Sequence, residues 1–297
     1  MKKTVTGENF GGILNDMDMH HIKYKIVYAC MIAALALICV ITIFPTLWIF
    51  MSAFKDTKEF LRVPPTIIPQ SFEPRKVAEV WGMVRFGKYL ANSGAIIIGT
   101  WFCAVVFNGM AGYVFAKIKP LGSGLVYKLI FFTMLMPTSM NMIPLYVEFT
   151  NFPIGGINLT NTYIPIWLMS AISAFDILLF RSFFMSISTS IVEAARIDGS
   201  SDIGIFAKII LPLSRPIIAV ISIFAVNGAW GNFFWPFLVL KKEELQPVAV
   251  MLYKMQPQLS ADKYMVLMMF STIPPLAIFL ALSKHIIGGI NLGGVKG

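Results

Sequence analysis

Long apolar stretches separated by shorter polar ones run through the whole chain. A helix needs about 20 apolar residues to cross a bilayer, and six stretches approach that length. We therefore expect six membrane-spanning helices, over residues 26–54, 93–116, 125–147, 162–180, 216–240 and 264–287. The pattern predicts an all-α integral membrane protein.

Several of the expected spans contain residues that interrupt helices. They are Pro137 and Pro144 in the third span, Gly228, Gly231 and Pro236 in the fifth, and Pro274 and Pro275 in the sixth. Proline lacks a backbone donor, and in lipid the freed acceptor must find a neighbouring helix, a side chain or water. Such kinks suit a bundle around a pathway, but they are equally common in packed helices without a transport role.

The composition supports a membrane protein. Hydrophobic residues make up 57% of the chain and charged residues 13%, whereas a soluble domain carries about 25% charged residues. The net charge of +9 fits basic residues that flank spans and meet anionic headgroups, so we expect contact with lipid and not with nucleic acid. Cys30, Cys39 and Cys103 lie in apolar runs without metal-site spacing, and we expect no metal or cofactor.

Charge also predicts the orientation. Six spans place both termini on one side, and the connection 148–161 contains no Lys or Arg, which is typical of an outer loop. Both termini are therefore predicted to be cytoplasmic. The expected organisation is a cytoplasmic segment 1–25, a transmembrane domain 26–290 with a cytoplasmic loop at 181–215, and a cytoplasmic tail 291–297.

The loop 181–215 contains a polar segment rich in small residues, Glu193-Ala194-Ala195-Arg196-Ile197-Asp198-Gly199. We expect a helix over 187–198, with one face formed by Ile187, Ile191, Ala194 and Ala195. Glu193 and Arg196 can pair three positions apart. Gly199 then occupies the position after the helix, where a left-handed backbone favours glycine.

Nine residues further on, Ile209-Ile210-Leu211-Pro212 closes a second expected helix, over 202–210. Its apolar stripe is predicted to be Ile203, Phe206, Ile209 and Ile210, with Pro212 ending it and Ser214 capping the fifth span. The pair of helices fits either an amphipathic hairpin on the bilayer surface or a docking site. The small residues offer little apolar area to lipid, which favours docking.

This spacing resembles the cytoplasmic EAA loop of bacterial ABC importer permeases, especially the carbohydrate-uptake group that includes the maltose transporter. Segments 44–48, 52–55, 161–163 and 180–184 are also similar to that family. The last five residues resemble the tail of the smaller maltose-permease subunit: Gly293, Gly294, Val295, Lys296 and Gly297. Ser188 departs from the pattern, because relatives often have proline there.

The resemblance implies a type I importer permease in a bacterial inner membrane that imports a sugar or oligosaccharide and performs no covalent chemistry. It implies a second, different permease, an ABC ATPase dimer that hydrolyses ATP, and an extracytoplasmic sugar-binding protein as partners. The residues implied to couple to the ATPase are Glu193, Ala194, Ala195, Asp198 and Gly199. The tail 293–297 would also reach the ATPase.

Two outer segments and three polar residues in the spans complete the picture. Segments 55–92 and 241–263 are either solvated connectors or contacts for the binding protein. A charged group in a membrane usually faces the bundle interior, so the pathway candidates are Asp176, Asn227 and Asn232. Asp176 can instead pair with Arg181. In the related maltose complex the sugar is held mainly by the other subunit.

Other functional classes are less well supported. Residues 82–88 fit G-x-x-x-x-G-K, but Tyr89 follows where a phosphate loop needs Ser or Thr, so we expect ATP to bind a separate polypeptide. The EAA spacing is shared by permeases for other solutes, which stay an alternative. A stand-alone secondary transporter or channel is a further alternative, although no internal repeat supports it.

Overall fold

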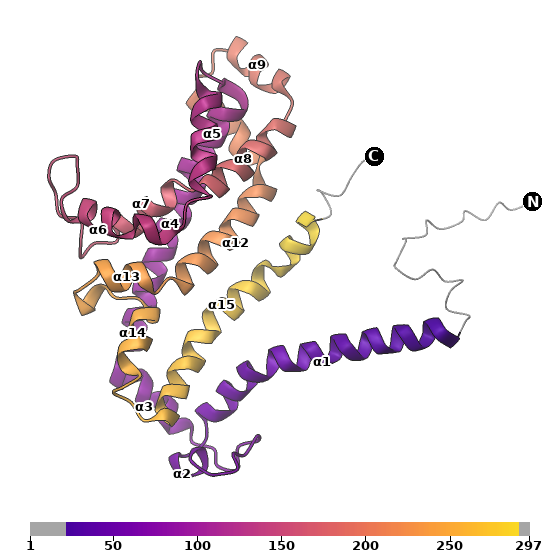
Figure 1. Cartoon of the computed structure of the whole chain (residues 1–297), viewed down its shortest axis with the longest axis vertical. Helices are drawn as coiled ribbons and strands as arrows, with labels where there is room; N and C mark the ends of the chain where they lie inside the picture. The colour runs from indigo at the N-terminus through magenta and orange to yellow at the C-terminus, as the bar shows by residue number, and fades with distance from the viewer. Residues whose placement is uncertain (1–21, 291–297) are drawn as a thin grey trace, which may run out of the picture.

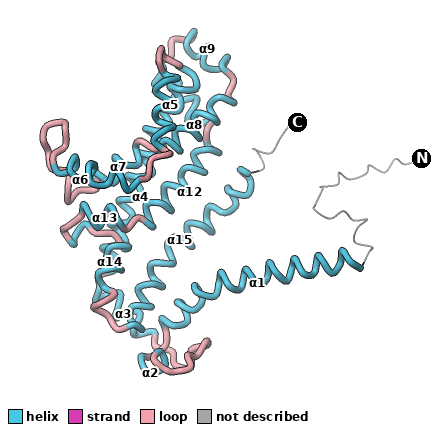
Figure 2. Tube along the Cα trace, in the orientation of Figure 1, coloured by secondary structure: helices cyan, strands magenta, loops and turns pink. Residues whose placement is uncertain are grey.

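The computed structural model describes residues 22–290, except for the side chains of residues 138–139 and 282–290. This part of the chain consists of helices and loops, with no extended strand (Figures 1 and 2). The all-α class predicted from the sequence is therefore confirmed. Most of the expected segment 1–25 and the whole tail 291–297, with its five candidate residues, lie outside the described residues.

Three helices are long and apolar enough to cross a membrane alone. They are α1 (Ile22–Ala53), α4 (Phe86–Tyr113) with its π-helical continuation η2 (Val114–Ile118), and α15 (Ala261–Ile290). They correspond to the first, second and sixth expected spans. The two consecutive prolines expected to interrupt the sixth span lie inside α15 without ending it.

Two further expected spans are broken. In the fourth, α7 (Ile164–Ala171) and α8 (Ala174–Ser186) meet at 43°. In the fifth, α12 (Arg215–Gly231) ends before α13 (Phe234–Val239) begins. The fifth span therefore ends where its second glycine was expected to interrupt it.

The expected third span is not one helix. The segment folds as α5 (Ser123–Thr133), the short η3 (Thr138–Asn141) and α6 (Met142–Thr150). Pro137 lies in the break, because it cannot supply the N–H that would continue α5. Two bent pairs can each be counted as one span: α7 with α8, and residues 202–213 with α12. The described residues then contain up to five spans that are long and apolar enough to cross a membrane.

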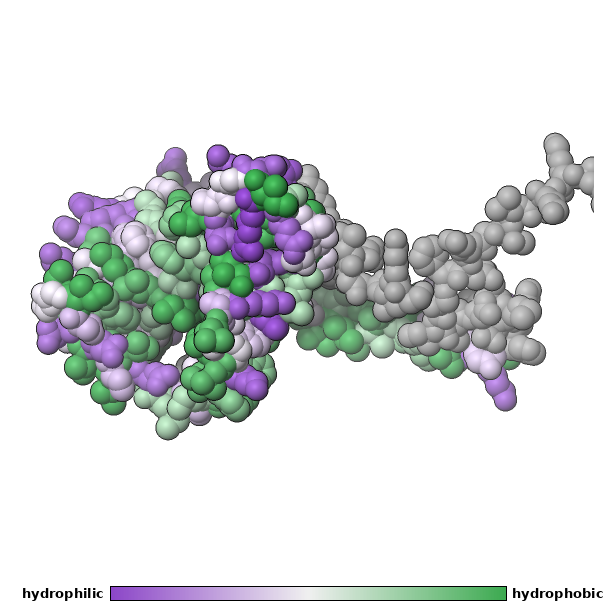
Figure 3. Space-filling model, turned by 90° about the horizontal axis from the view of Figure 1, so that it is seen from above, coloured by the Kyte–Doolittle hydropathy of each residue, from purple (hydrophilic) through white to green (hydrophobic). Residues whose placement is uncertain are grey.

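The segments expected on the two sides of the membrane lie at opposite ends of the long axis of the molecule (Figure 1). One end carries α9 (Thr189–Ile197), and the other carries α2 (Thr57–Phe60), α3 (Pro74–Val84) and the start of α15. Hydrophilic side chains gather over the α9 end when the molecule is seen from above (Figure 3). None of the residues in the most apolar window of α1 is buried within the chain, which leaves much of their surface for lipid or a partner.

Two of the buried clusters fix these ends. Near α9, Phe180 and Phe184 of α8 pack with Phe206 of the following loop. At the other end, Val80 of α3 and Leu267 of α15 pack with α1, α4 and α14 (Val248–Met255). Each end is therefore a packed unit and not a loose loop.

Glycine permits a close approach of two helices in the bundle. A Cβ on Gly112 of α4 would lie 2.6 Å from Cβ of Phe180 in α8, far inside van der Waals contact. The side of α4 that faces α8 therefore needs a residue without a side chain at this position, and α8 is held against α4 just before the loop that leads to α9.

Candidate functional site

The first helix of the loop, α9, is shorter than expected and turns a different face to the protein. It begins at Thr189, with Ser188 at its N-cap position. Val192 and Ala195 are the buried residues of α9, whereas Ala194 is exposed. The expected shared face was therefore wrong by about one position, because Phe184 and its neighbours supply the apolar surface that Val192 fills.

The end of α9 has the predicted glycine geometry. Gly199 has φ of +81°. Its N–H donates to the Arg196 carbonyl at 3.0 Å, and the Ser200 N–H donates to the Ala195 carbonyl at 2.9 Å. This pair of bonds is a Schellman motif. The expected left-handed position of Gly199 is confirmed.

The second helix of the loop is irregular. Ser201 caps α10 (Asp202–Ile205), which continues into the π-helical η4 (Phe206–Ile210) and α11 (Leu211–Leu213). Ile205, which was not in the expected stripe, is buried, and Ile203, which was, is 71% exposed. The π-helical turn shifts the register, so a stripe based on 3.6 residues per turn misplaces these side chains.

Pro212 lies inside α11 and does not end the second helix. The chain then bends by 84° into α12. Ser214 occupies the N-cap position of α12, but its hydroxyl donates to the Ile210 carbonyl at 2.6 Å instead of capping. Ser214 thus links the start of α12 to the end of η4 by a hydrogen bond across the bend.

Arg196 pairs with Asp202 and not with Glu193 as expected. Its Nη2 lies 2.9 Å from Asp202 Oδ1, and Nε also donates to this oxygen. The ion pair and its hydrogen bonds raise the pKa of Arg196. Because Asp202 comes from α10, the pair joins the two helices of the loop and leaves Glu193 exposed.

Four of the five predicted coupling residues share an exposed surface: Glu193, Ala194, Asp198 and Gly199. The fifth, Ala195, is 7% exposed and belongs to the core. Sequence reasoning missed Ile197, which is 87% exposed at the end of α9. A single exposed isoleucine is ordinary on a protein surface; Ile197 lies on the side of α9 opposite the buried Val192 and Ala195, and this position in the helix was the available signal.

The pathway candidates are only partly brought together. Asp176 and Asn232 line a pocket of about 340 Å³ between α4, α7, α8 and α12, whereas Asn227 does not line it. The expected alternative partner of Asp176, Arg181, lies over the Tyr127 ring at 4.2 Å from its centroid. Asp176 is therefore not held by that arginine.

A buried amide that was not among the candidates organises this region. Asn108 is fully buried, and its Nδ2 donates to the Ser170 carbonyl at 2.9 Å. Its Oδ1 accepts from the Ser173 N–H at 2.9 Å. One side chain of α4 thus hydrogen-bonds to a backbone group on each side of the break between α7 and α8.

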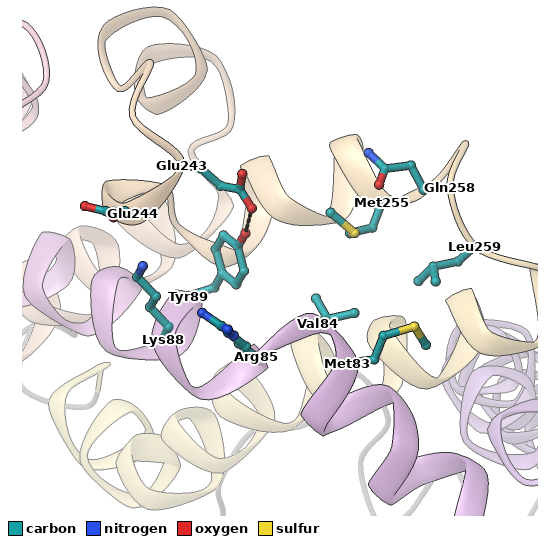
Figure 4. A pocket seen from close by; sticks show the side chains of 10 residues that line it. All are labelled: Met83, Val84, Arg85, Lys88, Tyr89, Glu243, Glu244, Met255, Gln258 and Leu259. Carbon is teal, nitrogen blue, oxygen red and sulfur yellow. Dashed lines mark hydrogen bonds between the residues drawn. The ribbon is translucent and has the colours of Figure 1, made fainter.

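A second pocket lies near the opposite end, between α4 and the segment after α13. It measures about 610 Å³. Arg85 and Lys88 face it from one side, and Glu243 of η5 (Glu243–Leu245) from the other (Figure 4). The Tyr89 hydroxyl donates to Glu243 Oε1 at 2.8 Å and joins the two sides.

The segment that fits a phosphate-loop pattern is the junction of two helices. It comprises the end of α3, a left-handed Arg85 with φ of +54°, and the start of α4. A phosphate loop instead joins a strand to a helix.

Residues 108–290 match the family model described as the binding-protein-dependent transport system inner membrane component. The chain belongs to this family. The match covers the end of α4 from Asn108, the whole loop with α9, and α15, so the loop and the break between α7 and α8 lie within the family region.

Relatives and a solved structure agree with this assignment. The arabinooligosaccharides transport system permease protein AraQ of Halalkalibacterium halodurans is 27% identical, over 88% of this chain and 94% of its own. The diacetylchitobiose uptake system permease protein NgcG of Streptomyces coelicolor is 27% identical, over 88% of this chain and 86% of the length of NgcG. A chain of a bacterial ABC transporter involved in the import of the acidic polysaccharide alginate superposes with a TM-score of 0.79, at 23% identity, over 92% and 99%.

The predicted family and the importer-permease fold are therefore confirmed. This inner membrane component has the chain fold of an ABC importer permease, and its long apolar helices fit a membrane location.

Proposed function

We propose that this chain is a permease subunit that carries a sugar or oligosaccharide inward, driven by ATP hydrolysis on a separate ATPase. The carrying observation is α9, an exposed helix of small and acidic residues held on a packed base at one end of the molecule. The arabinooligosaccharide and diacetylchitobiose permeases among the relatives support a carbohydrate cargo.

Coupling in this proposal runs through packing. The ATPase receives the exposed surface of α9 around Ala194, where the absence of large side chains allows close approach. Val192 and Ala195 carry the movement into the cluster that contains Phe180 of α8. Because packed interiors transmit displacement, closure of the ATPase dimer would tilt α8 and α12 and alternate access between the two faces.

Three surfaces of the chain support this set of partners. A second, different permease completes the pathway beside α12, whose Gly228 and Gly231 have open space where a Cβ would stand. The sugar-binding protein docks outside, over the pocket between Arg85 and Glu243. The α9 end and both termini are cytoplasmic, and the tail 293–297 reaches the ATPase.

An affinity pull-down of the tagged full chain from mild detergent tests the proposal. The native chain should recover an ATPase and a second permease, and Glu193→Lys should lower ATPase recovery several-fold. Glu79→Lys, an exposed glutamate at the opposite end, is the matched control. A chain that purifies alone and transports solute without ATP in liposomes would instead be a secondary transporter or channel.

The cargo needs its own experiment. Uptake of labelled arabinotriose, maltotriose and a non-sugar control such as spermidine in cells that express the whole complex separates a sugar permease from one for another solute. Uptake of a sugar that disappears in an ATPase-deficient strain supports the proposal, and uptake of spermidine alone overturns the carbohydrate assignment.

A further inference from the structure

The pocket between α4, α7, α8 and α12 lies where two helices are interrupted. One break separates α7 from α8, and the other separates α12 from α13 at Asn232. Irregular backbone at membrane depth is tolerated where it is buried in protein or lines a water-filled cavity. Polar residues from both breaks, Ser173 and Asn232, line this pocket, so the interruptions supply its polar groups.

Thr100 indicates that the pocket receives a polar ligand. Thr100 is 8% exposed and lines the pocket, and its Oγ1 has no hydrogen-bond partner among the described residues. A buried hydroxyl without a partner is unfavourable, because it has lost its hydrogen bonds to water. Asn232 uses its Oδ1 for the Trp235 N–H at 3.4 Å, and its amide nitrogen is available to donate.

Asp176 stands at the first turn of α8 in a half-formed capping box. The Ser173 hydroxyl accepts from the Asp176 N–H at 3.2 Å. In a complete box the acidic side chain would accept the N–H of the capping residue, but Asn108 already accepts the Ser173 N–H. The Asp176 carboxylate is thus not needed as a backbone cap, and it lines the pocket beside the Ser173 hydroxyl, with which it interacts.

The described lining of this pocket carries negative charge and no positive charge. Of the described residues that line it, Asp176 alone is ionisable, and no Lys, Arg or His is among them. Arg181 is engaged on Tyr127. A carboxylate accepts hydrogen bonds from hydroxyl groups but repels another carboxylate, and this repulsion is strong where water is scarce. Phe224 and Met169 provide apolar walls for the C–H faces of a ring.

We propose that this pocket is a solute-binding site of the chain itself, which takes a neutral, hydroxyl-rich unit and disfavours a uronate. The inference rests on the proposed sugar import and adds to it a cargo class and a site. The fold alone does not impose this preference, since the superposable chain belongs to an importer of an acidic polysaccharide.

Binding to the purified full chain in lipid nanodiscs tests the site without any partner. Saturation-transfer NMR with arabinotriose and trigalacturonate reports weak affinities. We expect arabinotriose to bind at least about tenfold more tightly than trigalacturonate. Asp176→Asn should remove most of this difference, and Thr100→Val should weaken arabinotriose about threefold to tenfold.

Two control variants match these changes outside the pocket. Glu148→Gln removes an exposed carboxylate from α6, and Thr42→Val removes an exposed hydroxyl from α1; neither should alter the ratio. Thermal unfolding confirms that each variant is folded. The site is overturned if arabinotriose gives no signal with the native chain, if trigalacturonate binds as tightly, or if folded Asp176→Asn and Thr100→Val both bind like the native chain.

Uptake and binding measured together distinguish an error in the pocket assignment from an error in the proposed function. If ATP-dependent sugar uptake by the whole complex persists while the pocket variants bind both trisaccharides like the native chain, only the pocket assignment falls. If uptake proceeds without the ATPase, the proposed function falls whatever the NMR shows.

Discussion

Arg196 and Asp202 form an ion pair across the turn between α9 and α10, with Nη2 2.9 Å from Oδ1. The two side chains are 43% and 46% exposed, so solvent screens the pair and its contribution to stability is small. Its effect is on geometry: it joins α9 to α10 and adds to the buried packing of Val192 and Ala195 in orienting α9.

Reversing one charge of this pair should disturb ATPase docking. We expect Asp202→Arg to lower ATPase recovery in a pull-down several-fold, because two cations then face each other across the turn. Arg196→Asp with Asp202→Arg should restore recovery. The Glu79–Lys263 pair, at 2.8 Å near the other end, is the control, and its reversal should leave recovery unchanged. Native recovery with Asp202→Arg alone contradicts the role of the pair.

Gly199 offers a test of backbone geometry. Gly199→Val should reduce both complex assembly and uptake, because φ of +81° disfavours a β-branched residue by about 1 to 2 kcal/mol. Gly122 also has φ of +81° and open space around it, so Gly122→Val imposes the same strain in a different turn, outside the loop 181–215. Equal losses for the two variants would mean that strain alone, and not docking at α9, explains the effect.

The close approach of α4 and α8 predicts a large effect of one methyl group. Gly112→Ala would place a Cβ 2.6 Å from the Phe180 Cβ, and we expect a loss of about 1 to 3 kcal/mol from overpacking. Gly94→Ala, on the same helix with nothing within 4 Å, should be neutral or slightly stabilising. Thermal unfolding in detergent compares them, and similar midpoints would contradict the packing described.

A buried ion pair holds the opposite end. Lys76 Nζ lies 3.5 Å from Asp262 Oδ2, with side chains 5% and 1% exposed, and the Thr57 hydroxyl donates to the same oxygen at 3.0 Å. Asp262→Asn leaves Lys76 as an uncompensated buried charge, which should cost about 3 to 5 kcal/mol. The double variant Lys76→Met with Asp262→Leu should recover much of this, as measured by denaturant unfolding. A double variant as unstable as Asp262→Asn would count against the pairing.

The hydrogen bonds of Glu59 predict that the loop over residues 59–71 is sensitive to acid. Burial alone would raise the pKa of its carboxylate, but hydrogen bonds from Ser71, Thr66 and the Gln70 and Ser71 amides outweigh it and lower the pKa to about 2. Because the folded pKa lies below the ordinary 4.5, this stabilisation is complete above about pH 4.5 and is lost as pH falls toward 2.

Hydrogen exchange at the Gln70 and Ser71 amides, which donate to Glu59 at 2.8 and 2.7 Å, measures this effect. After correction for intrinsic rates, protection should fall between pH 4.5 and 2 in the native chain. Glu59→Gln should show low protection at every pH. Native protection that is independent of pH over this window would show that the carboxylate does not hold the loop.

The sequence was sufficient where local chemistry decides the structure. Gly199 after a short helix predicted its left-handed turn, and uninterrupted apolar length predicted α1. It was insufficient where distant contacts decide. Pro137 ends a helix whereas Pro274 does not, and this difference depends on neighbouring helices. The partner of Arg196 also depended on how the second helix packs.

The candidate site shows the same division. The spacing of the EAA loop located α9, but a π-helical turn moved Ile203 to the surface and Ile205 into the core. Asn108 could not be assigned its role, because the break that it bridges lies more than 60 residues away. Thr100 gave no sequence signal, since a threonine in an apolar helix is ordinary.

The central claim is that the exposed surface of α9 receives the ATPase. A photo-crosslinking residue in place of Ala194, in the assembled complex within membranes, tests it most directly. The same residue in place of Arg85, in the pocket at the opposite end of the molecule, is the control. We predict a crosslinked product between position 194 and the ATPase whose yield changes on ATP binding, and none from position 85. An import-competent complex that gives no ATPase product from position 194 would contradict the account.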